Sequence, residues 1–258
     1  MPALALVTGA SAGIGRETAL ALAAAGCGVV ATARRAEPLA ELSRAGAIEP
    51  VAADVTAADG RARIAAAVGD RRLGLLVHGA GLFPRGLITS LSADDWQRAI
   101  ATNVLARLEL FLALRNALAG GRVLFVGSDA AVNPRAGGAA YSVSKAASEM
   151  LWRCLATEQG DEIAFGMAKP GLVETAMLDD SLRMPRAEFP AGEVYAAMRD
   201  RGETIAAATV ARFFCFLLLE TSREEFASGI WDIRDTAHHP RWLTAPLYVP
   251  RRSRSPAG

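Results

Sequence analysis

Short apolar runs alternate with longer amphipathic segments along most of the chain. The apolar runs predict strands at 3–8, 28–33, 48–53, 73–78, 122–127, 162–168 and 229–233, and the amphipathic segments predict helices at 14–25, 36–44, 57–68, 93–118, 141–158 and 207–220. This alternation is typical of a parallel sheet whose strands are joined by right-handed helical crossovers. The sequence therefore predicts an α/β protein with a single-domain Rossmann fold, a doubly wound parallel sheet of about seven strands with helices on both faces.

Two segments depart from the alternation. Residues 176–203 contain Pro185, Pro190 and mixed charges without a helical period, so we expect an irregular insert there. The tail at 250–258 has no apolar anchors and is expected to be disordered, although its arginines could instead form a contact patch. No linker or internal repeat divides the rest, and residues 1–249 are predicted to form one domain.

Composition and charge narrow the possible partners. The formal net charge of +1 gives no reason to expect binding to nucleic acid or to an anionic membrane. The three cysteines are far apart and odd in number, which favours a reducing compartment over a disulfide scaffold or a zinc ribbon. The most apolar run, 213–219, is far shorter than the ~20 residues of a membrane span. Because the first strand begins directly after Met1, no signal peptide is expected, and the protein is predicted to be cytoplasmic.

A glycine-rich turn follows the first predicted strand. Gly9, Gly13 and Gly15 have the spacing Gly-x-x-x-Gly-x-Gly, which differs from the more familiar Gly-x-Gly-x-x-Gly, and a predicted helix begins within the turn. A strand, a glycine turn and a helix in this order present free backbone N–H groups and a positive dipole end to a pyrophosphate. The turn therefore indicates a dinucleotide site, with a purely structural turn as the alternative.

Tyr141 and Lys145 form the most informative pair, because Lys145 and Lys169 are the only lysines among 28 basic residues. Residues four apart on a helix lie on one face, with about 5–6 Å between their Cβ atoms. A lysine ammonium there can stabilise a phenolate and lower the tyrosine pKa from about 10, as a general acid or base requires. The alternative is a surface pair. Ser128 ends a predicted strand, where open α/β sheets place their ligands.

With these features in place, the chain resembles the short-chain dehydrogenase/reductase family over about residues 3–235. The matching stretches, in the family's order, are Thr8-Gly9 to Gly13-Ile14-Gly15, Asp54-Val55, Ala80-Gly81, Asn103-Val104, Ser128, Tyr141 to Lys145, and Pro170 to Thr175. The resemblance implies cofactor contacts from Gly9, Ser11, Gly13, Ile14, Gly15, Arg34, Arg35, Asp54, Val55, Ala80, Gly81, Asn103, Tyr141, Lys145, Pro170, Gly171, Val173 and Thr175. For Asp54, the alternative is an N-cap of the following helix.

The end of the second predicted strand indicates which cofactor is used. NAD-preferring Rossmann proteins usually have an acidic residue there for the ribose hydroxyls, whereas this chain has Ala33 followed by Arg34 and Arg35. An arginine can bind a 2′-phosphate bidentately, so we expect NADP(H) and consider NAD(H) less suitable. Ala12 departs from the pattern, because many NADP-binding relatives carry a basic residue at that place. The alternative is that both arginines merely begin a solvated helix.

The resemblance also implies a mechanism for four residues. Tyr141 would supply a proton, Ser128 would polarise the carbonyl oxygen, and Lys145 would lower the tyrosine pKa and bind the nicotinamide ribose. Asn103 would interrupt a helix and hold a water that links Lys145 to solvent; a helix cap is the alternative. The expected enzyme is an NADPH-dependent oxidoreductase that reduces a ketone or aldehyde of a small molecule, or runs in reverse, as a homodimer or homotetramer through 93–118 and 141–158.

Other residues depart from the family pattern or suggest other functions. His78 stands where relatives have asparagine, and we expect a strand-end histidine with a backbone partner rather than a catalytic one. His238 and His239 are adjacent, so their side chains should diverge, and no catalytic metal is predicted. A sensor that binds NADP(H) without turnover remains an alternative; a hydrolase is disfavoured because no Gly-x-Ser-x-Gly elbow is present. The substrate pocket is expected at 83–85, at 129–140 and in a mobile lid formed by 176–203.

Overall fold

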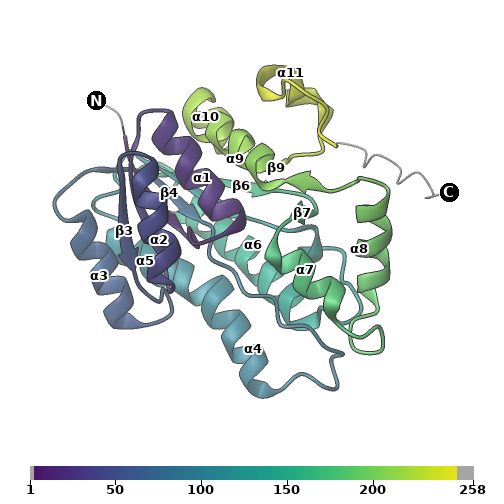
Figure 1. Ribbon diagram of the computed structural model, residues 1–258. Helices are drawn as coiled ribbons and strands as arrows, with labels where there is room; N and C mark the ends of the chain where they lie inside the picture. Colours follow the sequence, from purple (N-terminus) through teal and green to yellow (C-terminus); the bar gives the residue numbers. More distant parts are fainter. Residues whose placement is uncertain (1–2, 249–258) are drawn as a thin grey trace.

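The computed structural model describes residues 3–248 and is built around a seven-stranded parallel sheet (Figure 1). In the order β3-β2-β1-β4-β5-β6-β9, the strands are Ile48–Ala52, Gly28–Ala33, Leu4–Thr8, Leu73–His78, Arg122–Val126, Ala164–Lys169 and Ile230–Asp232. Every neighbouring pair in this sheet is parallel. The predicted Rossmann architecture is confirmed, and every predicted strand is present.

Helices cover both faces of the sheet (Figure 1). They are α1 Gly13–Ala24, α2 Ala36–Leu42, α3 Ala58–Val68, α4 Ala93–Ile100, α5 Ala106–Leu114, α6 Ala139–Gln159, α7 Ala176–Arg183, α8 Ala191–Asp200, α9 Ala207–Cys215, α10 Arg223–Phe226 and α11 His239–Trp242. One buried cluster unites α1, α2 and α9, and the other unites α3, α5 and α6. In β1, Leu6 belongs to one cluster and Val7 to the other, because strand side chains alternate between faces. A strand buried on both sides therefore reads as a continuous apolar run.

The strand order reverses at β1, which lies between β2 and β4. In open parallel sheets, ligands bind at the carboxyl edge where the order reverses. The glycine turn follows β1 at this edge, and the segments after β4 and β5 lie beside it. The topology therefore places the predicted motifs along one crevice.

The helix predicted at 93–118 is interrupted. It consists of α4, a π turn at Ala101–Leu105 and then α5, which ends at Leu114. A π turn inserts an extra residue into the helical repeat and often occurs at functional sites. Asn103 lies within it and is fully buried. The periodicity of 93–118 predicted a single helix, and the interruption at Asn103 that the family resemblance implied is present.

The segment 176–203 is not irregular as predicted. It forms α7 and α8, and two short parallel strands, β7 at Val173–Glu174 and β8 at Ile205–Ala206, join its ends. Leu178 and Phe189 are buried, and Arg199 forms ion pairs with Glu174 and Asp179. Both helices are short and mix apolar with polar residues, so packing rather than a long apolar period determines them. Movement of this segment stays a prediction, and the tail at 250–258 lies outside the described residues.

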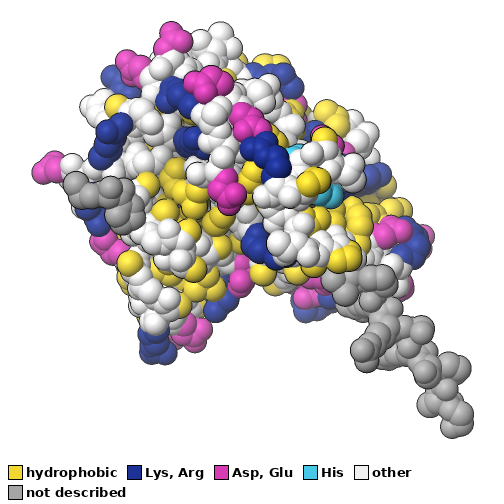
Figure 2. Space-filling model, turned by 90° about the horizontal axis from the view of Figure 1, so that it is seen from above, with side chains coloured by type: hydrophobic (Ala, Val, Ile, Leu, Met, Phe, Trp, Pro, Cys, Tyr) yellow, Lys and Arg dark blue, Asp and Glu magenta, His cyan; other side chains and the backbone are white. Residues whose placement is uncertain are grey.

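The surface has mixed charge. On the face shown in Figure 2, acidic and basic side chains lie interspersed, without a broad region of one sign. Among the described helices, none has the length and apolarity that crossing a bilayer requires. Cys27, Cys154 and Cys215 are all free thiols.

Candidate active site

Most of the predicted site residues directly follow the carboxyl ends of parallel strands. Gly9, Ser11, Gly13, Ile14 and Gly15 follow β1, Arg34 and Arg35 follow β2, Asp54 and Val55 follow β3, Ala80 and Gly81 follow β4, Ser128 follows β5, and Pro170 and Gly171 follow β6. Val173 lies in β7 with Thr175 just beyond it, and Asn103, Tyr141 and Lys145 lie on helices. The fold brings the predicted residues to one edge of the sheet.

The glycines allow the turn after β1 to pack against its neighbours without side chains. A Cβ on Gly15 would stand 2.4 Å from the Gly9 carbonyl oxygen, and one on Gly9 would stand 2.8 Å from the Ala80 nitrogen. Ala12, which precedes α1, provides no side-chain cap for the helix. The uncapped N–H groups at the positive end of α1 can therefore bind an anion.

The loop after β6 reaches the same turn. A Cβ on Gly13 would stand 3.1 Å from the Thr175 Cγ2 atom, so Thr175 covers the glycine turn from the side of β7. Gly171 has a φ of +70°, and a Cβ there would meet the Ile205 side chain at 2.9 Å. The Pro170–Thr175 segment is thereby held between the glycine turn and β8.

The ends of β2 and β3 carry the charged part of the crevice. Arg34 and Arg35 are exposed, and the Arg35 Nη2 atom donates to the Ser11 carbonyl (3.4 Å) and hydroxyl (3.3 Å) oxygens. Asp54 accepts hydrogen bonds from the N–H (2.8 Å) and hydroxyl (2.7 Å) of Thr56. Burial alone would raise the pKa of Asp54, but these bonds and the charge of Arg34 lower it by more. The pKa therefore lies below its ordinary value, and the carboxylate is ionised at neutral pH. The N-cap interpretation of Asp54 was wrong, because Ala57 precedes α3.

Ser128, Tyr141 and Lys145 lie together beyond the end of β5. The Ser128 hydroxyl lies close enough to Tyr141 to lower the tyrosine pKa, and Ser128 Oγ accepts from the Ala130 N–H at 3.2 Å. The Lys145 Nζ atom lies 5.5 Å from the centroid of the Tyr141 ring. It donates to the Val126 carbonyl oxygen at 2.9 Å. The surface-pair interpretation was therefore wrong.

Burial controls the charge of this pair. It raises the pKa of Tyr141, while the Ser128 hydroxyl and the charges of Arg107 and Arg85 lower it. Burial also holds the pKa of Lys145 well below its ordinary value, and the positive charge of Arg107 lowers it further. Both side chains are therefore biased toward their neutral forms in this structure.

Asn103 links three parts of the site. Its Oδ1 atom accepts from the Leu82 N–H at 2.9 Å, and its Nδ2 atom donates to the Leu82 carbonyl oxygen and to Ser144 Oγ, both at 2.8 Å. Because Asn103 lies within the π turn, the helix-cap interpretation was wrong. The side chain ties the loop after β4 to α6.

His78 ends β4 with its ring buried. The Nε2 atom has no hydrogen-bond partner, so the expected backbone partner was wrong for this nitrogen. The ring packs on Phe125 with 4.8 Å between centroids. Burial, aided by the charge of Arg107, lowers the pKa of His78 well below its ordinary value, which makes it a neutral, structural residue.

Three aromatic side chains, Phe83, Phe189 and Tyr195, lie beside Tyr141 and form an aromatic ridge. The sequence could not predict that they pack together, because they come from distant segments. The Phe83 ring stacks on Tyr141 with 4.2 Å between centroids and an interplanar angle of 22°. Phe189 lies edge-on to Phe83 at 5.7 Å, and Tyr195 lies 5.7 Å beyond Phe189. Arg85 lies over Phe83 and donates to Ser181 Oγ at 2.7 Å, which joins this loop to α7. Tyr195 was missed; its rarity as one of three tyrosines was the available signal.

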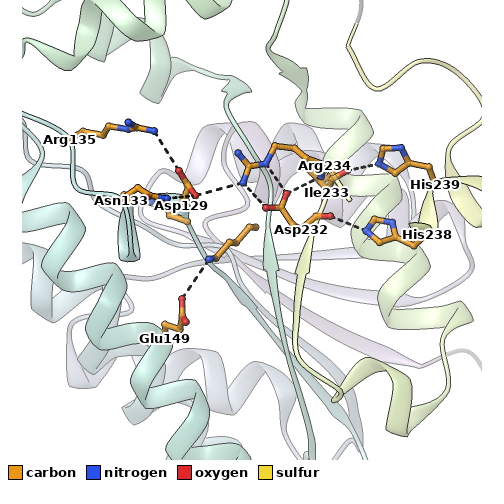
Figure 3. Close-up of polar contacts among 12 residues, drawn as sticks. Asp129, Asn133, Arg135, Glu149, Asp232, Ile233, Arg234, His238 and His239 are labelled. Atoms are coloured by element: carbon orange, nitrogen blue, oxygen red, sulfur yellow. Dashed lines mark hydrogen bonds and ion pairs between the residues drawn. The ribbon is translucent and has the colours of Figure 1, made fainter. Parts of the chain in front are cut away.

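A chain of charged contacts runs from the loop after β5 to the end of β9 (Figure 3). Asp129 accepts from Asn133 at 3.0 Å and lies 3.5 Å from an Arg135 nitrogen and 3.7 Å from an Arg234 nitrogen. Arg234 also pairs with Asp232 at 2.5 Å. These contacts fix the loop after Ser128 against the C-terminal strand.

The two adjacent histidines point to different backbone oxygens (Figure 3). His238 Nε2 lies 2.9 Å from the Asp232 carbonyl oxygen, and His239 Nε2 lies 2.7 Å from that of Ile233. Within residues 3–248, no three His, Cys, Asp or Glu side chains come together in a way that could hold a metal ion. The two histidine rings therefore hold the backbone at the end of β9.

Comparisons with known proteins agree with this geometry. The family model for short chain dehydrogenases matches residues 3–185. The chain is 35% identical over 175 residues to 2,3-dihydro-2,3-dihydroxybenzoate dehydrogenase of Escherichia coli, covering 66% of this chain and 69% of that protein. Two solved structures are also similar. The KRED1-Pglu enzyme has a TM-score of 0.81 and 29% identity over 88% of this chain and 99% of its own. L-sorbose reductase of Gluconobacter frateurii, complexed with NADPH and L-sorbose, has a TM-score of 0.79 and 25% identity over 90% and 95%.

The family match covers more than half of the chain and includes every strand from β1 to β6. The chain belongs to the short chain dehydrogenase family and is an NAD(P)-dependent oxidoreductase that acts on CH–OH and C=O groups.

Proposed function

We propose that this enzyme uses NADPH to reduce a ketone or aldehyde carbonyl of a small molecule, or catalyses the reverse oxidation, through Ser128, Tyr141, Lys145 and Asn103. The observation that carries this proposal is the cluster beyond β5, in which Ser128 lies close to Tyr141 and Lys145 Nζ lies 5.5 Å from the centroid of the tyrosine ring. A proton donor and a second hydrogen-bond donor at one point match the needs of a carbonyl oxygen that gains negative charge.

The residues at the carboxyl edge fit a dinucleotide. The uncapped start of α1 and the glycine turn would hold the pyrophosphate, and Thr175 covers that turn. The adenosine would lie between the segments that follow β3 and β4. These segments contain Asp54 and Val55, and Ala80 and Gly81, and their backbone would approach the cofactor closely. Bound there, the cofactor supplies the hydride.

Arg34 and Arg35 support a preference for NADPH. Both are exposed after β2, and Ala33 leaves no carboxylate at the strand end to repel a 2′-phosphate. Arg35 is already held against Ser11, so its guanidinium lies beside the glycine turn. The similar L-sorbose reductase was solved with NADPH, which agrees with this preference.

Four side chains divide the proton chemistry. Tyr141 donates its hydroxyl proton to the substrate oxygen, and Ser128 polarises the same oxygen. Lys145, which donates to the Val126 carbonyl oxygen, would bind the nicotinamide ribose and, once protonated beside the bound cofactor, would stabilise the phenolate left on Tyr141. Asn103 fixes the loop after β4 through Leu82 and holds the π turn that would place a water between Lys145 and solvent.

Phe83 and Tyr195, which lie beside the fully buried Phe189, support a flat substrate. Because Tyr141 stacks on Phe83 and Arg85 lies over it, a ring that reaches the Tyr141 hydroxyl would meet Phe83 edge-on, a contact that adds about 0.5–1.5 kcal/mol beyond burial. We therefore propose that aryl or conjugated carbonyl compounds are preferred over compact aliphatic ones.

Exposed apolar side chains support assembly into a homodimer or homotetramer. Leu105 and Leu112 near α5 are 46% and 52% exposed, and Val143 and Met150 on α6 are 49% and 58% exposed. Such a surface is more typical of an interface than of a solvated face. Sedimentation velocity should give a mass of two or four times 27.0 kDa, and a monomer would contradict this assignment.

The test of the proposed function is an assay of NADPH and NADH consumption over a panel of ketones and aldehydes, with cofactor binding measured separately. We expect turnover with NADPH on at least one aryl carbonyl compound. Binding of NADPH without turnover across the panel and its alcohols would favour the sensor alternative.

A further inference from the structure

Arg85 is a half-buried cation close to the proposed proton donor. Its Cζ atom lies 4.8 Å from the centroid of the Phe83 ring, and the Tyr141 ring stacks on Phe83 with 4.2 Å between centroids. Because a stacked ring and a guanidinium cannot share one face of a phenyl ring, Phe83 lies between Tyr141 and Arg85. A molecule of aryl size that is bound at the Tyr141 hydroxyl can therefore reach the guanidinium around the edge of Phe83.

The hydrogen bonds that Arg85 forms within residues 3–248 all go to neutral oxygens. Its Nε atom donates to Ser181 Oγ at 2.7 Å, and its Nη1 atom donates to the Phe83 carbonyl oxygen at 3.1 Å. Its Nη2 atom donates to the Met177 carbonyl oxygen. Since a guanidinium has five N–H groups, each Nη atom keeps one N–H for a further acceptor.

No carboxylate in the described part of the chain forms an ion pair with Arg85, although α7, which it contacts, carries two. Asp179 pairs with Arg199 at 2.9 Å, and Asp180 pairs with Arg183 at 2.8 Å. Burial lowers the pKa of Arg85, and the charge of Asp180 raises it by less. A partly buried cation is costly unless an anion offsets its lost hydration, so this guanidinium favours an anionic partner.

The neighbouring arginines differ from Arg85 in one of two ways. Arg135 and Arg234 both pair with Asp129, at 3.5 Å and 3.7 Å (Figure 3). Arg107 is only 3% exposed, so a substrate cannot reach it. Arg85 is both accessible and without a paired carboxylate, which is the combination that a binding residue for an anion requires.

We propose that Arg85 is a specificity-determining residue that binds a carboxylate of the substrate, so that aryl keto acids or formyl acids are preferred over neutral aryl carbonyl compounds. The inference rests on the proposed function and adds an anionic group to the aryl carbonyl compound proposed there. A guanidinium binds a carboxylate through two parallel N–H groups, and such a bond is stronger beside apolar rings than in water.

The experiment measures kcat/KM with NADPH for two matched pairs of ketones, para-acetylbenzoate with para-acetylbenzamide and meta-acetylbenzoate with meta-acetylbenzamide. The members of a pair have nearly the same shape but differ in charge, so general damage to the enzyme cancels from their ratio. We expect the wild type to favour the carboxylate of at least one pair by about ten- to hundredfold.

Three variants assign this preference to a residue. Arg85→Gln should bring the ratio near one, whereas Arg85→Lys should keep part of it, because an ammonium retains the charge without the planar fork. Arg98→Gln removes a positive charge from the surface of α4 and is the matched control, which should keep the wild-type ratio. For the wild type alone, added salt should lower the ratio, because it screens the ion pair and leaves the neutral ketone unaffected.

A wild-type ratio near one in both pairs would overturn the proposal. A wild-type ratio retained in Arg85→Gln would also overturn it, since that result shows an arginine that only joins its loop to α7. If Arg85→Gln does not fold, a wild-type ratio that salt fails to lower has the same meaning. Failure of the proposed function is seen separately, as a lack of turnover on every ketone or as unchanged turnover in Tyr141→Phe.

Discussion

The two halves of the carboxyl edge are built in different ways. The half after β1 to β3 is made of backbone: the glycine turn packs its main chain against the segment after β4, and α1 begins without a side-chain cap. The half beyond β5 is made of side chains from distant segments, such as Phe83, Tyr141 and Phe189. A backbone site needs particular residues at short spacing, whereas a side-chain site needs only the right contacts after folding. Substitutions in the two halves should therefore separate cofactor binding from substrate choice.

The largest effect of this kind is expected at the end of β2. Arg34→Ala should weaken NADPH binding by roughly ten- to hundredfold, the usual range for one bidentate arginine–phosphate contact, and leave NADH binding nearly unchanged. Ala33→Asp should shift preference toward NADH. The exposed Arg44→Ala is the matched control and should bind NADPH like wild type. Titration of cofactor fluorescence measures all four proteins, and equal wild-type affinities for NADH and NADPH would show the arginine interpretation to be wrong.

A smaller effect is expected on the side-chain half. Phe83→Leu keeps an apolar residue but removes the ring that stacks on Tyr141. We expect kcat/KM for an aryl ketone to fall about tenfold relative to its cyclohexyl analogue, with NADPH affinity unaltered. Steady-state kinetics on the matched pair of ketones measure the ratio. If both ketones lose activity equally, the ridge does not select flat substrates.

The smallest effect concerns the segment 176–203, which we predict to act as a lid. Although it is helical, its exposed Met177 and Val194 and its polar surface leave room for movement. Limited proteolysis within the segment should slow a few-fold when NADPH and substrate are present together. Cleavage at the same rate in both states would exclude a lid that closes on ligands.

The predictable features were those with a short-range signature. The spacing of Tyr141 and Lys145, the glycines after β1 and the apolar strands each depend on residues close in sequence, and the structure places them as expected. The apolar pattern of 93–118 did not show the π turn at Asn103, because a helix with one extra residue keeps nearly the same pattern, and only the family resemblance implied an interruption there. Its existence depends on contacts with Leu82 and Ser144, which are distant in sequence.

Arg107 shows a second limit of prediction from the sequence. An arginine in a helix normally predicts a solvated face, and only the fold brings Val126 and Ser148 within its reach. The same reasoning applies to His78, whose buried ring depends on Phe125 from a neighbouring strand. Cofactor preference, the lid and the oligomeric state stay predictions, because each depends on a molecule that binds to the chain: the cofactor, the substrate or a second copy of the protein.

The most direct test of the account is to remove the hydroxyl of Tyr141 while keeping its ring. Tyr141→Phe preserves the stacking with Phe83, so the variant should fold and bind NADPH like wild type. Its turnover should fall by ~10²–10⁴, the usual contribution of general acid–base catalysis. Lys145→Arg, measured in parallel, should lose turnover and also bind NADPH more weakly, because the planar guanidinium does not fit between phenol and ribose. Near-normal turnover of Tyr141→Phe on a carbonyl compound that the wild type reduces would contradict the central claim that this tyrosine is the proton donor.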